Sequence, residues 1–266
     1  MPERYTLGHH ESVLRSHRWR TAENSASYLL PHLRPGMNVL DVGSGPGTIT
    51  VDLARIVFPG KVIGIDASEA VVAEATEHAR ELGVANVEFR VADAYDTGFE
   101  PGSFDVVHAH QVLQHLARPV EALAAWRVLV APDGLVAARD CDYVGSVIHP
   151  ETQGIRDWRD SYVALARSNG GNPDAGRRMK GWAREAGFTD VTATASLWTW
   201  SDDPTREWWG GLWADRAVES EYATGVIESG IGDRALLDSV RDGWRGWRDD
   251  HDAIMLMPHG EIIARG

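Results

Sequence analysis

The sequence of 266 residues contains one cysteine, Cys141, and therefore cannot form a disulfide within the chain. It has no apolar run long enough to cross a bilayer. Its N-terminal residues lack the layout of a secretory signal peptide. These absences predict a cytoplasmic protein without a membrane span, in which Cys141 is a small buried hydrophobic residue.

Positive charge is scarce, because 26 Lys and Arg residues stand against 39 Asp and Glu residues, and the formal net charge is -13. An acidic surface repels phosphate backbones, so we expect a small-molecule partner and no nucleic acid. Internal repeats and low-complexity tracts are absent. The composition, 43% hydrophobic and 24% charged, is that of one large globular domain or of one domain with an added cap.

Three glycines stand on alternate positions directly after a short apolar run, in the stretch VLDVGSGPGTIT of residues 39–50. The apolar run is too short for a helix and indicates a buried strand, after which a helix begins near Thr48. Glycine reaches backbone angles that other residues rarely adopt, and it lets a ligand approach the main chain closely. A strand, a glycine turn and a helix in this order are typical of a site for a nucleotide-type cofactor.

From about residue 38 to residue 140, strand-like and helix-like segments alternate. This alternation predicts an α/β, Rossmann-like sheet, mostly parallel, with right-handed crossovers and helices on both faces. Ligands of such sheets bind beyond the carboxyl ends of the strands. The expected strands are residues 38–42, 61–65, 87–91, 104–109 and 134–138.

The segments outside this alternation suggest a covered site. We expect residues 1–35 to form a helical segment over the site, 36–201 and 251–266 to form the core, and 202–250 to form a helical insertion that acts as a lid. Seven of the eleven tryptophans fall between Trp198 and Trp247. Trp209 and Trp244 follow a helical spacing typical of packing between helices, whereas Trp208 does not. The tryptophans could therefore form a core or wall a substrate pocket.

Acidic residues near the glycines discriminate between cofactors. The glycines spell G-x-G-x-G, and Thr48 stands where a dinucleotide site would have its third glycine. Asp41, within the first strand, would face the pyrophosphate of a dinucleotide unfavourably, but it is compatible with the ammonium and sulfonium groups of S-adenosylmethionine (SAM). These two features argue against the alternative of an NAD-dependent oxidoreductase.

Two more acids end the next two strands. Asp66 is placed to accept hydrogen bonds from ribose hydroxyls, as in NAD sites and SAM sites alike. Asp93 could accept from an adenine amino group while the N–H of Ala94 donates to a ring nitrogen; alternatively, Asp93 is a turn residue. Three acids at the ends of three consecutive strands are more specific than the glycines alone.

Five stretches occur in the order and spacing of the motifs of class I SAM-dependent methyltransferases: VLDVGSGPGTIT, VIGIDAS, VEFRVADA, FDVVHAHQVLQHL and LVAPDGLVAARD. Over residues 36–140 the chain resembles this family, and in particular the group that includes ubiquinone/menaquinone-biosynthesis methyltransferases. The resemblance implies a seven-stranded sheet whose last strand is antiparallel. It also implies SAM as the cofactor and S-adenosyl-L-homocysteine (SAH) as its product.

The resemblance implies contacts with each part of the cofactor. It assigns the glycine turn to the methionine part, the end of the second strand to the ribose, the end of the third strand to adenine, and the end of the fourth strand to the reacting centre. Arg20 is the candidate partner of the methionine carboxylate, because arginine binds carboxylates in a bidentate fork, although a surface position is an alternative. The expected cofactor-binding residues are Asp41, Gly43, Ser44, Gly45, Gly47, Asp66, Ala67, Asp93, Ala94, His110, Gln111 and Arg20.

Three histidines are candidate general bases, because a neutral imidazole can take a proton from a hydroxyl group or a carbon acid. They are His110, His115 and His10. If a helix starts near Gln111, then Gln111 and His115 share one of its faces. Structural packing is the alternative for His110 and His115, and a solvated tail is the alternative for His10.

Asp140 and Asp142 flank the cysteine after the fifth strand, but two acids supply too few oxygen ligands for magnesium. We expect no metal. The sequence therefore predicts a SAM-dependent methyltransferase that transfers a methyl group, by direct displacement, to a small acceptor of apolar or aromatic character. The alternatives are a protein that binds SAM or SAH for other chemistry or for regulation, and an RNA or protein methyltransferase, which the charge disfavours.

Overall fold

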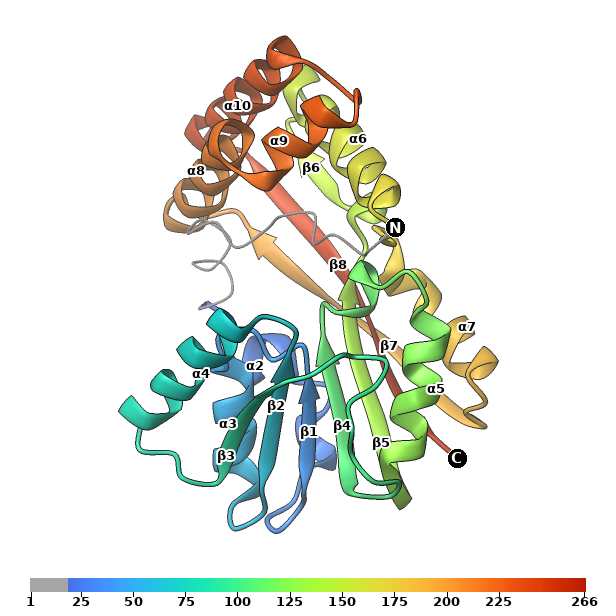
Figure 1. Cartoon of the computed structure of the whole chain (residues 1–266). Helices are drawn as coiled ribbons and strands as arrows, with labels where there is room; N and C mark the ends of the chain where they lie inside the picture. Colours follow the sequence, from blue (N-terminus) through green and yellow to red (C-terminus); the bar gives the residue numbers. More distant parts are fainter. Residues whose placement is uncertain (1–18) are drawn as a thin grey trace.

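The computed structural model describes residues 19–266, which are built around an eight-stranded mixed sheet (Figure 1). The strand order is β3-β2-β1-β4-β5-β8-β6, and β7 pairs with the other edge of β8. Strands β1 to β5 are parallel, and β8 runs antiparallel to β5, β6 and β7. The strands are β1 (Val39–Val42), β2 (Val62–Asp66), β3 (Val87–Val91), β4 (Phe104–His110), β5 (Val130–Cys141), β6 (Val147–His149), β7 (Asp190–Trp200) and β8 (Ile254–Arg265).

The sheet is α/β with an antiparallel last strand, which confirms the expected fold class. It has one strand more than the seven expected, because the short strand β6 also pairs with β8. Strand β5 also begins four residues earlier than expected, at Val130. Its pairing with β4 shifts register between Phe104 and Val106.

Helices cover both faces of the sheet. Because successive residues of a strand point to opposite faces, neighbouring strand residues pack against different helices. Leu40 and Val107 belong to one hydrophobic cluster with α5 and α7, whereas the neighbouring Val39 and Val106 belong to a second cluster with α2 and α3. The helices around the sheet are α2 (Ala22–Ser25), α3 (Thr48–Val57), α4 (Glu69–Glu81), α5 (Pro119–Leu129) and α7 (Ala175–Glu185).

Four further helices form a cap over one end of the sheet (Figure 1). Strand β7 runs parallel to β5 and leads directly into α8, so the cap lies beyond the carboxyl ends of the parallel strands. Residues 202–250 contain three helices, because Ser220 ends α8 and its side chain caps α9. The cap helices are α6 (Gln153–Ser168), α8 (Asp203–Glu219), α9 (Glu221–Glu228) and α10 (Arg234–Asp249).

The cap has its own aromatic core. Trp158 of α6 lies 5.0 Å from Trp213 and 4.9 Å from Trp244, measured between ring centroids. These three rings are fully buried. Helix α6, which the expected boundaries assign to the sheet domain, therefore packs with the insertion.

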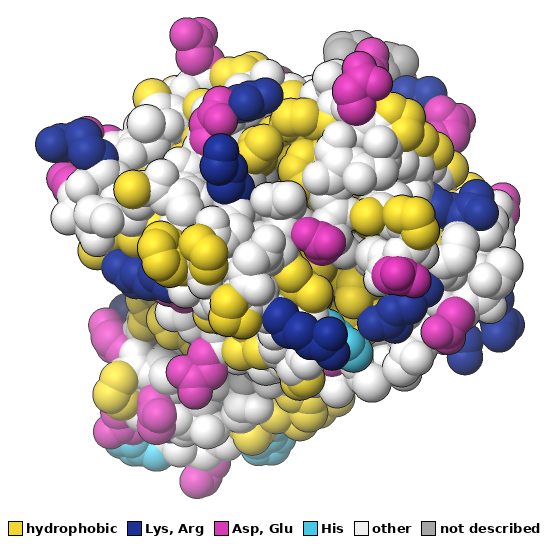
Figure 2. All heavy atoms as spheres, turned by 90° about the horizontal axis from the view of Figure 1, so that it is seen from below, with side chains coloured by type: hydrophobic (Ala, Val, Ile, Leu, Met, Phe, Trp, Pro, Cys, Tyr) yellow, Lys and Arg dark blue, Asp and Glu magenta, His cyan; other side chains and the backbone are white. Residues whose placement is uncertain are grey.

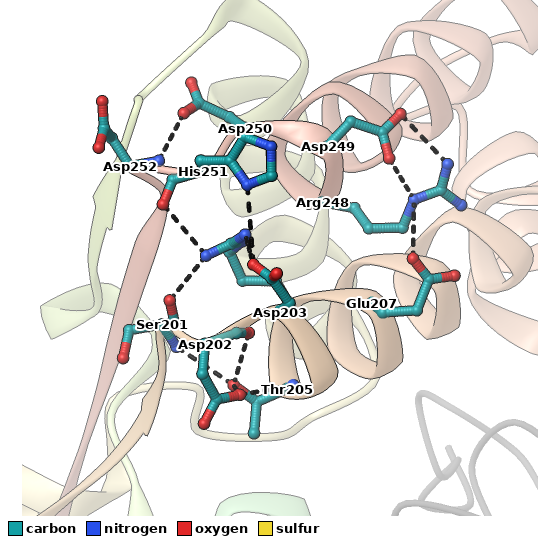
Figure 3. Close-up of polar contacts among 11 residues, drawn as sticks. Ser201, Asp202, Asp203, Thr205, Glu207, Arg248, Asp249, Asp250, His251 and Asp252 are labelled. Carbon is teal, nitrogen blue, oxygen red and sulfur yellow. Dashed lines mark hydrogen bonds and ion pairs between the residues drawn. The ribbon is translucent and has the colours of Figure 1, made fainter.

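Polar contacts join the start of α8 to the end of α10 (Figure 3). The side chain of Asp202 accepts a hydrogen bond from the N–H of Thr205 (2.8 Å) and caps α8. The guanidinium of Arg206, which is buried, donates to the carbonyls of Ser201 (2.7 Å) and His251 (3.2 Å). These bonds tie the chain entering the cap to the chain leaving it.

Figure 2 shows the face that is seen from below in Figure 1. Basic, acidic and hydrophobic side chains are interspersed there. Within residues 19–266, no helix combines the length and the apolar character needed to span a bilayer.

Candidate active site

A cavity of about 390 Å³ opens at the carboxyl ends of β1, β2 and β4. Most of the residues that the sequence suggested for cofactor binding line it. These are Arg20, Asp41, Gly43, Ser44, Gly45, Asp66, Ala67, Ala94, His110 and Gln111. We refer to this space as the cofactor cavity.

The glycine turn after β1 requires glycine at more than one position. Gly43, Gly45 and Gly47 have φ angles of 68°, 54° and 81°, in the left-handed region that other residues rarely adopt. A Cβ at Gly43 would lie 2.4 Å from a methyl carbon of Val112, and one at Gly47 would lie 2.7 Å from the ring of Phe89. Gly43 and Gly45 line the cofactor cavity, whereas Gly47 is outside its lining and serves as the N-cap of α3.

Asp41 lies at the buried base of the cofactor cavity, with both carboxylate oxygens bonded to the protein. One oxygen accepts from the hydroxyl of Thr50 (2.6 Å) and the other from Nδ1 of His108 (2.7 Å). This carboxylate therefore contributes negative charge at a fixed position, consistent with a cationic ligand group nearby.

Asp66, at the end of β2, connects two segments of the cavity wall. Its carboxylate accepts hydrogen bonds from the N–H groups of Gly45 (3.1 Å) and Ser68 (3.0 Å). Asp66 therefore orders the glycine turn and the start of α4, besides facing the cavity.

The end of β3 differs in part from the expectation. Asp93 is exposed, and its Oδ1 accepts from the N–H of Tyr95 (2.8 Å), as in the turn alternative. Asp93 is outside the lining of the cofactor cavity, whereas Ala92 and Ala94 on either side of it belong to that lining. The wall here is thus formed by the chain next to Asp93.

A helix starting at Gln111, the condition under which Gln111 and His115 would share a face, does not form. Gln111 has a φ of 56°, and a single 3-10 turn, η2 (Leu113–His115), follows it. Gln111 nevertheless lines the cofactor cavity together with His110 and His115. The Nη2 atom of Arg20 donates to Oε1 of Gln111 at 2.6 Å.

His110 is 5% exposed, and neither of its ring nitrogens has a hydrogen-bond partner among residues 19–266. Burial and the positive charges of Arg20 and Arg139 hold the pKa of His110 well below its usual value. Burial also lowers the pKa of His115, to about 3. Both imidazoles are therefore neutral at physiological pH. His10 lies outside the described residues.

A second, smaller cavity of about 20 Å³ adjoins the first. Arg20, Gln111 and His115 line both cavities and thus form the junction between them. The walls of the second cavity are mainly aromatic and come from the sheet, the cap and the segment before α2. They include Trp19, Tyr143, Trp198, Trp200, Trp208 and Trp209. We call this space the aromatic cavity.

The acids near the cysteine have structural partners. Asp140 is buried, accepts from the N–H of Leu113 (3.0 Å), and has a pKa raised to about 8 by burial. Asp142 forms an ion pair with Arg177. Cys141 is buried and donates to Oε1 of Gln114, and burial raises the pKa of its thiol.

A family model described as a methyltransferase domain matches residues 33–192. The chain belongs to this methyltransferase family. An uncharacterized methyltransferase of Schizosaccharomyces pombe is 31% identical over 98% of this chain and 96% of its own length. The family, the motif order and the strand order together make the protein a class I SAM-dependent methyltransferase, as expected. The alternative of an NAD-dependent oxidoreductase is wrong.

Two solved structures share the fold at low sequence identity. The YcgJ protein from Bacillus subtilis is 18% identical with a TM-score of 0.60, over 91% of this chain and 98% of that chain. A phosphoethanolamine N-methyltransferase of Haemonchus contortus was solved with phosphomonomethylethanolamine and SAH. It is 20% identical with a TM-score of 0.54, over 87% of this chain and 49% of that chain.

The residues of this methyltransferase fit SAM on two observations. First, the cofactor cavity brings the carboxylate of Asp41, the backbone of a glycine turn and the end of β2 together. Second, the hydroxyl of Ser44 and both ring nitrogens of His110 are buried in its wall without hydrogen-bond partners among the described residues. Buried polar atoms are normally paired, so these atoms are consistent with a polar ligand.

Several residues that line the aromatic cavity or contact residues of its lining could not be found from the cofactor motifs. Trp198 and Trp200 alternate along β7 and therefore point to one face, which is the only local signal. His259 is brought to the site by the register in which Ser196 of β7 pairs with His259 of β8. Arg139 of β5 is buried beside them, with its Nε 3.3 Å from Glu261 and its guanidinium 4.8 Å from the ring of Trp198.

Proposed function

We propose that this methyltransferase methylates a small molecule of apolar or aromatic character, whose reacting group lies at the junction of the two cavities. The observation that carries the proposal is the aromatic lining of the second cavity, which meets the cofactor cavity at Arg20, Gln111 and His115. At about 20 Å³ this cavity has room for little more than a water molecule, so an acceptor ring would enter as the tryptophan side chains around it move apart. Aromatic rings bind planar apolar ligands by stacked and edge-to-face contacts. A wall of tryptophans enclosed by a cap favours a small molecule over a polymer.

The protein's own part is to bind, orient and exclude water. SAM, when bound, supplies a methyl group that is activated by its sulfonium. Asp66 and Ala67 would hold the ribose, the chain at Ala94 would hold adenine, and Arg20 would pair with the methionine carboxylate. Alignment of two reactants in a dry site is itself a large contribution to rate.

A proton must leave when the acceptor attacks through a hydroxyl or an N–H group. Of the candidate bases, His110 is supported best, because its two ring nitrogens are buried in the cavity wall and have no partner among the described residues. A neutral imidazole can accept the proton as the methyl group is transferred. Because burial, together with the charges of Arg20 and Arg139, disfavours the imidazolium of His110, this arrangement suits acceptors with a fairly acidic proton.

The test is the fate of the methyl group. The purified protein is incubated with methyl-labelled SAM and a panel of small phenols, aromatic amines and aliphatic alcohols. We expect label in an extractable aromatic product, together with stoichiometric SAH. Label that appears only in added RNA or protein would overturn the proposal. Binding of SAM without transfer to any added compound or cell extract would favour the alternative of a SAM-binding protein with another role.

A further inference from the structure

A chain of three hydrogen-bonded side chains crosses the junction between the two cavities. Nη2 of Arg20 donates to Oε1 of Gln111 (2.6 Å), and Nε2 of Gln111 lies 2.9 Å from Nε2 of His259. His259 is fully buried on β8, with its ring centroid 4.3 Å from that of Trp198. We propose that His259 and Gln111 are positioning residues that hold the guanidinium of Arg20 at the cofactor cavity.

The direction of every bond in this chain is determined by its two ends. Nδ1 of His259 lies 3.1 Å from the carbonyl oxygen of Met257, which can only accept, so Nδ1 carries the proton. In a neutral imidazole, Nε2 then accepts, and the amide nitrogen of Gln111 donates to it. The amide oxygen of Gln111 consequently faces Arg20, which can only donate. Only this orientation of the amide satisfies both neighbours.

The hydrogen bonds from Arg20 through Gln111 to His259 require a neutral His259. If Nε2 of His259 also carried a proton, it would face the NH₂ group of Gln111, and the amide would have to turn its own NH₂ toward Arg20. The hydrogen bond to Arg20 would then be lost. Burial and the charges of Arg139 and Arg20 lower the pKa of His259 well below its usual value, which keeps the imidazole neutral.

The backbone of Gln111 indicates that its side chain is needed at this position. Its φ of 56° is unfavourable for a residue with a side chain and would suit glycine better. The N–H of Gln111 donates to the carbonyl of Arg139 at 2.7 Å, which anchors the strained residue to β5. The fold thus accepts strain here and directs the amide between Arg20 and His259.

The inference rests on the proposed contact of Arg20 with the carboxylate of the cofactor, and two ligands separate its consequences. SAH and 5′-methylthioadenosine share the adenosine and the thioether, but 5′-methylthioadenosine lacks the amino and carboxylate groups. Dissociation constants of both ligands are measured by calorimetry for the wild type and for Arg20→Met, His259→Phe, His259→Gln and the double variant Arg20→Met/His259→Phe.

We expect Arg20→Met and His259→Phe each to weaken SAH binding about tenfold, the loss expected for one hydrogen bond to a charged group. Binding of 5′-methylthioadenosine should stay within about twofold of wild type. The double variant should bind SAH no more weakly than Arg20→Met alone, because both changes act on one contact. His259→Gln can accept from Gln111 and donate to Met257, and should retain most of the affinity.

If His259→Phe weakened the binding of SAH and of 5′-methylthioadenosine equally, the inference would be overturned. Such a result would indicate a general disturbance of the pocket and not the loss of a contact with the carboxylate. Additive losses in the double variant would also overturn it. If His259→Phe does not fold, Gln111→Gly takes its place, since it removes the amide and relieves the backbone. A wild-type protein that binds neither ligand would instead contradict the cofactor assignment, independently of His259.

Discussion

Asp66 combines structural hydrogen bonds with a position in the wall of the cofactor cavity. Its carboxylate holds the N–H groups of Gly45 and Ser68, and it also lines the cofactor cavity. We expect Asp66→Ala to weaken SAM binding by about 1–3 kcal/mol, because ribose hydroxyls and two backbone donors lose their acceptor. Calorimetry with SAM measures this loss. Glu69→Ala, on the first turn of α4 and outside the cavity lining, is the control. An Asp66→Ala protein with an unchanged dissociation constant would place the ribose elsewhere.

Asp140 makes the folding stability of the protein depend on pH. Its carboxylate accepts from the N–H of Leu113, and burial raises its pKa to about 8 in the folded protein, whereas the value for an unfolded chain is about 3.9. Between these values the folded state holds one more proton than the unfolded state. Stability therefore falls as pH rises toward 8, by up to about 1.4 kcal/mol per pH unit.

The matched variant is Asp140→Asn, whose amide oxygen can still accept from Leu113 but cannot ionise. We expect it to be more stable than wild type at pH 8, and the advantage should shrink as pH falls toward 5. Melting temperatures across this range measure the difference. Asp142→Asn, which loses an ion pair with Arg177, is the contrasting change and should destabilise at pH 8. A constant gap between wild type and Asp140→Asn at all pH values would show that Asp140 does not titrate in this range.

Among helices and strands, the sequence predicted best those whose buried side chains recur at a regular spacing along the chain. The parallel strands and their helices follow from apolar runs, the glycine turn and the Ser68 cap, and all of these are present. A helix starting at Gln111 is absent, because Gln111 adopts a left-handed φ and its N–H donates to the carbonyl of Arg139, which is remote in sequence. Strand β6 has three residues and is defined by its pairing with β8, so no local pattern could indicate it.

In the candidate site, too, some residues follow from local sequence patterns and others depend on contacts between distant segments. Asp41, Asp66 and the glycines adjoin strand ends, so topology alone places them at the cavity. Trp198 lines the aromatic cavity, and His259 contacts Gln111 at the junction. Both positions depend on the pairing register of β7 and β8, two antiparallel strands that lie far from the motifs in the sequence. Composition suggested a tryptophan-rich cap, but which tryptophans face the cavity depends on how four helices pack against one another.

At the scale of the whole molecule, the cap and the sheet meet at the aromatic cavity. Substitution of two tryptophans of the cap can test whether these side chains stabilise the cap or bind the acceptor. Trp244 of α10 is fully buried among the rings of the cap core. Trp208 of α8 is half-buried and lines the aromatic cavity, and its ring centroid lies 5.4 Å from that of Trp19, which lines the same cavity. The two side chains are chemically identical, so they form a matched pair of substitutions.

We expect Trp244→Ala to lower the free energy of unfolding by about 3–5 kcal/mol, the usual cost of truncating a buried tryptophan. Trp208→Ala should leave the melting temperature and the dissociation constant of SAH nearly unchanged, because the cofactor cavity is built by other residues. It should lower kcat/KM for the aromatic acceptor by roughly tenfold, since a ring contact and its buried area contribute on the order of 1–2 kcal/mol. Thermal unfolding, calorimetry and label transfer together give the three readouts. If Trp208→Ala instead lowers the melting temperature as Trp244→Ala does, with no selective kinetic effect, the tryptophans of α8 only hold the cap together, and the acceptor binds elsewhere.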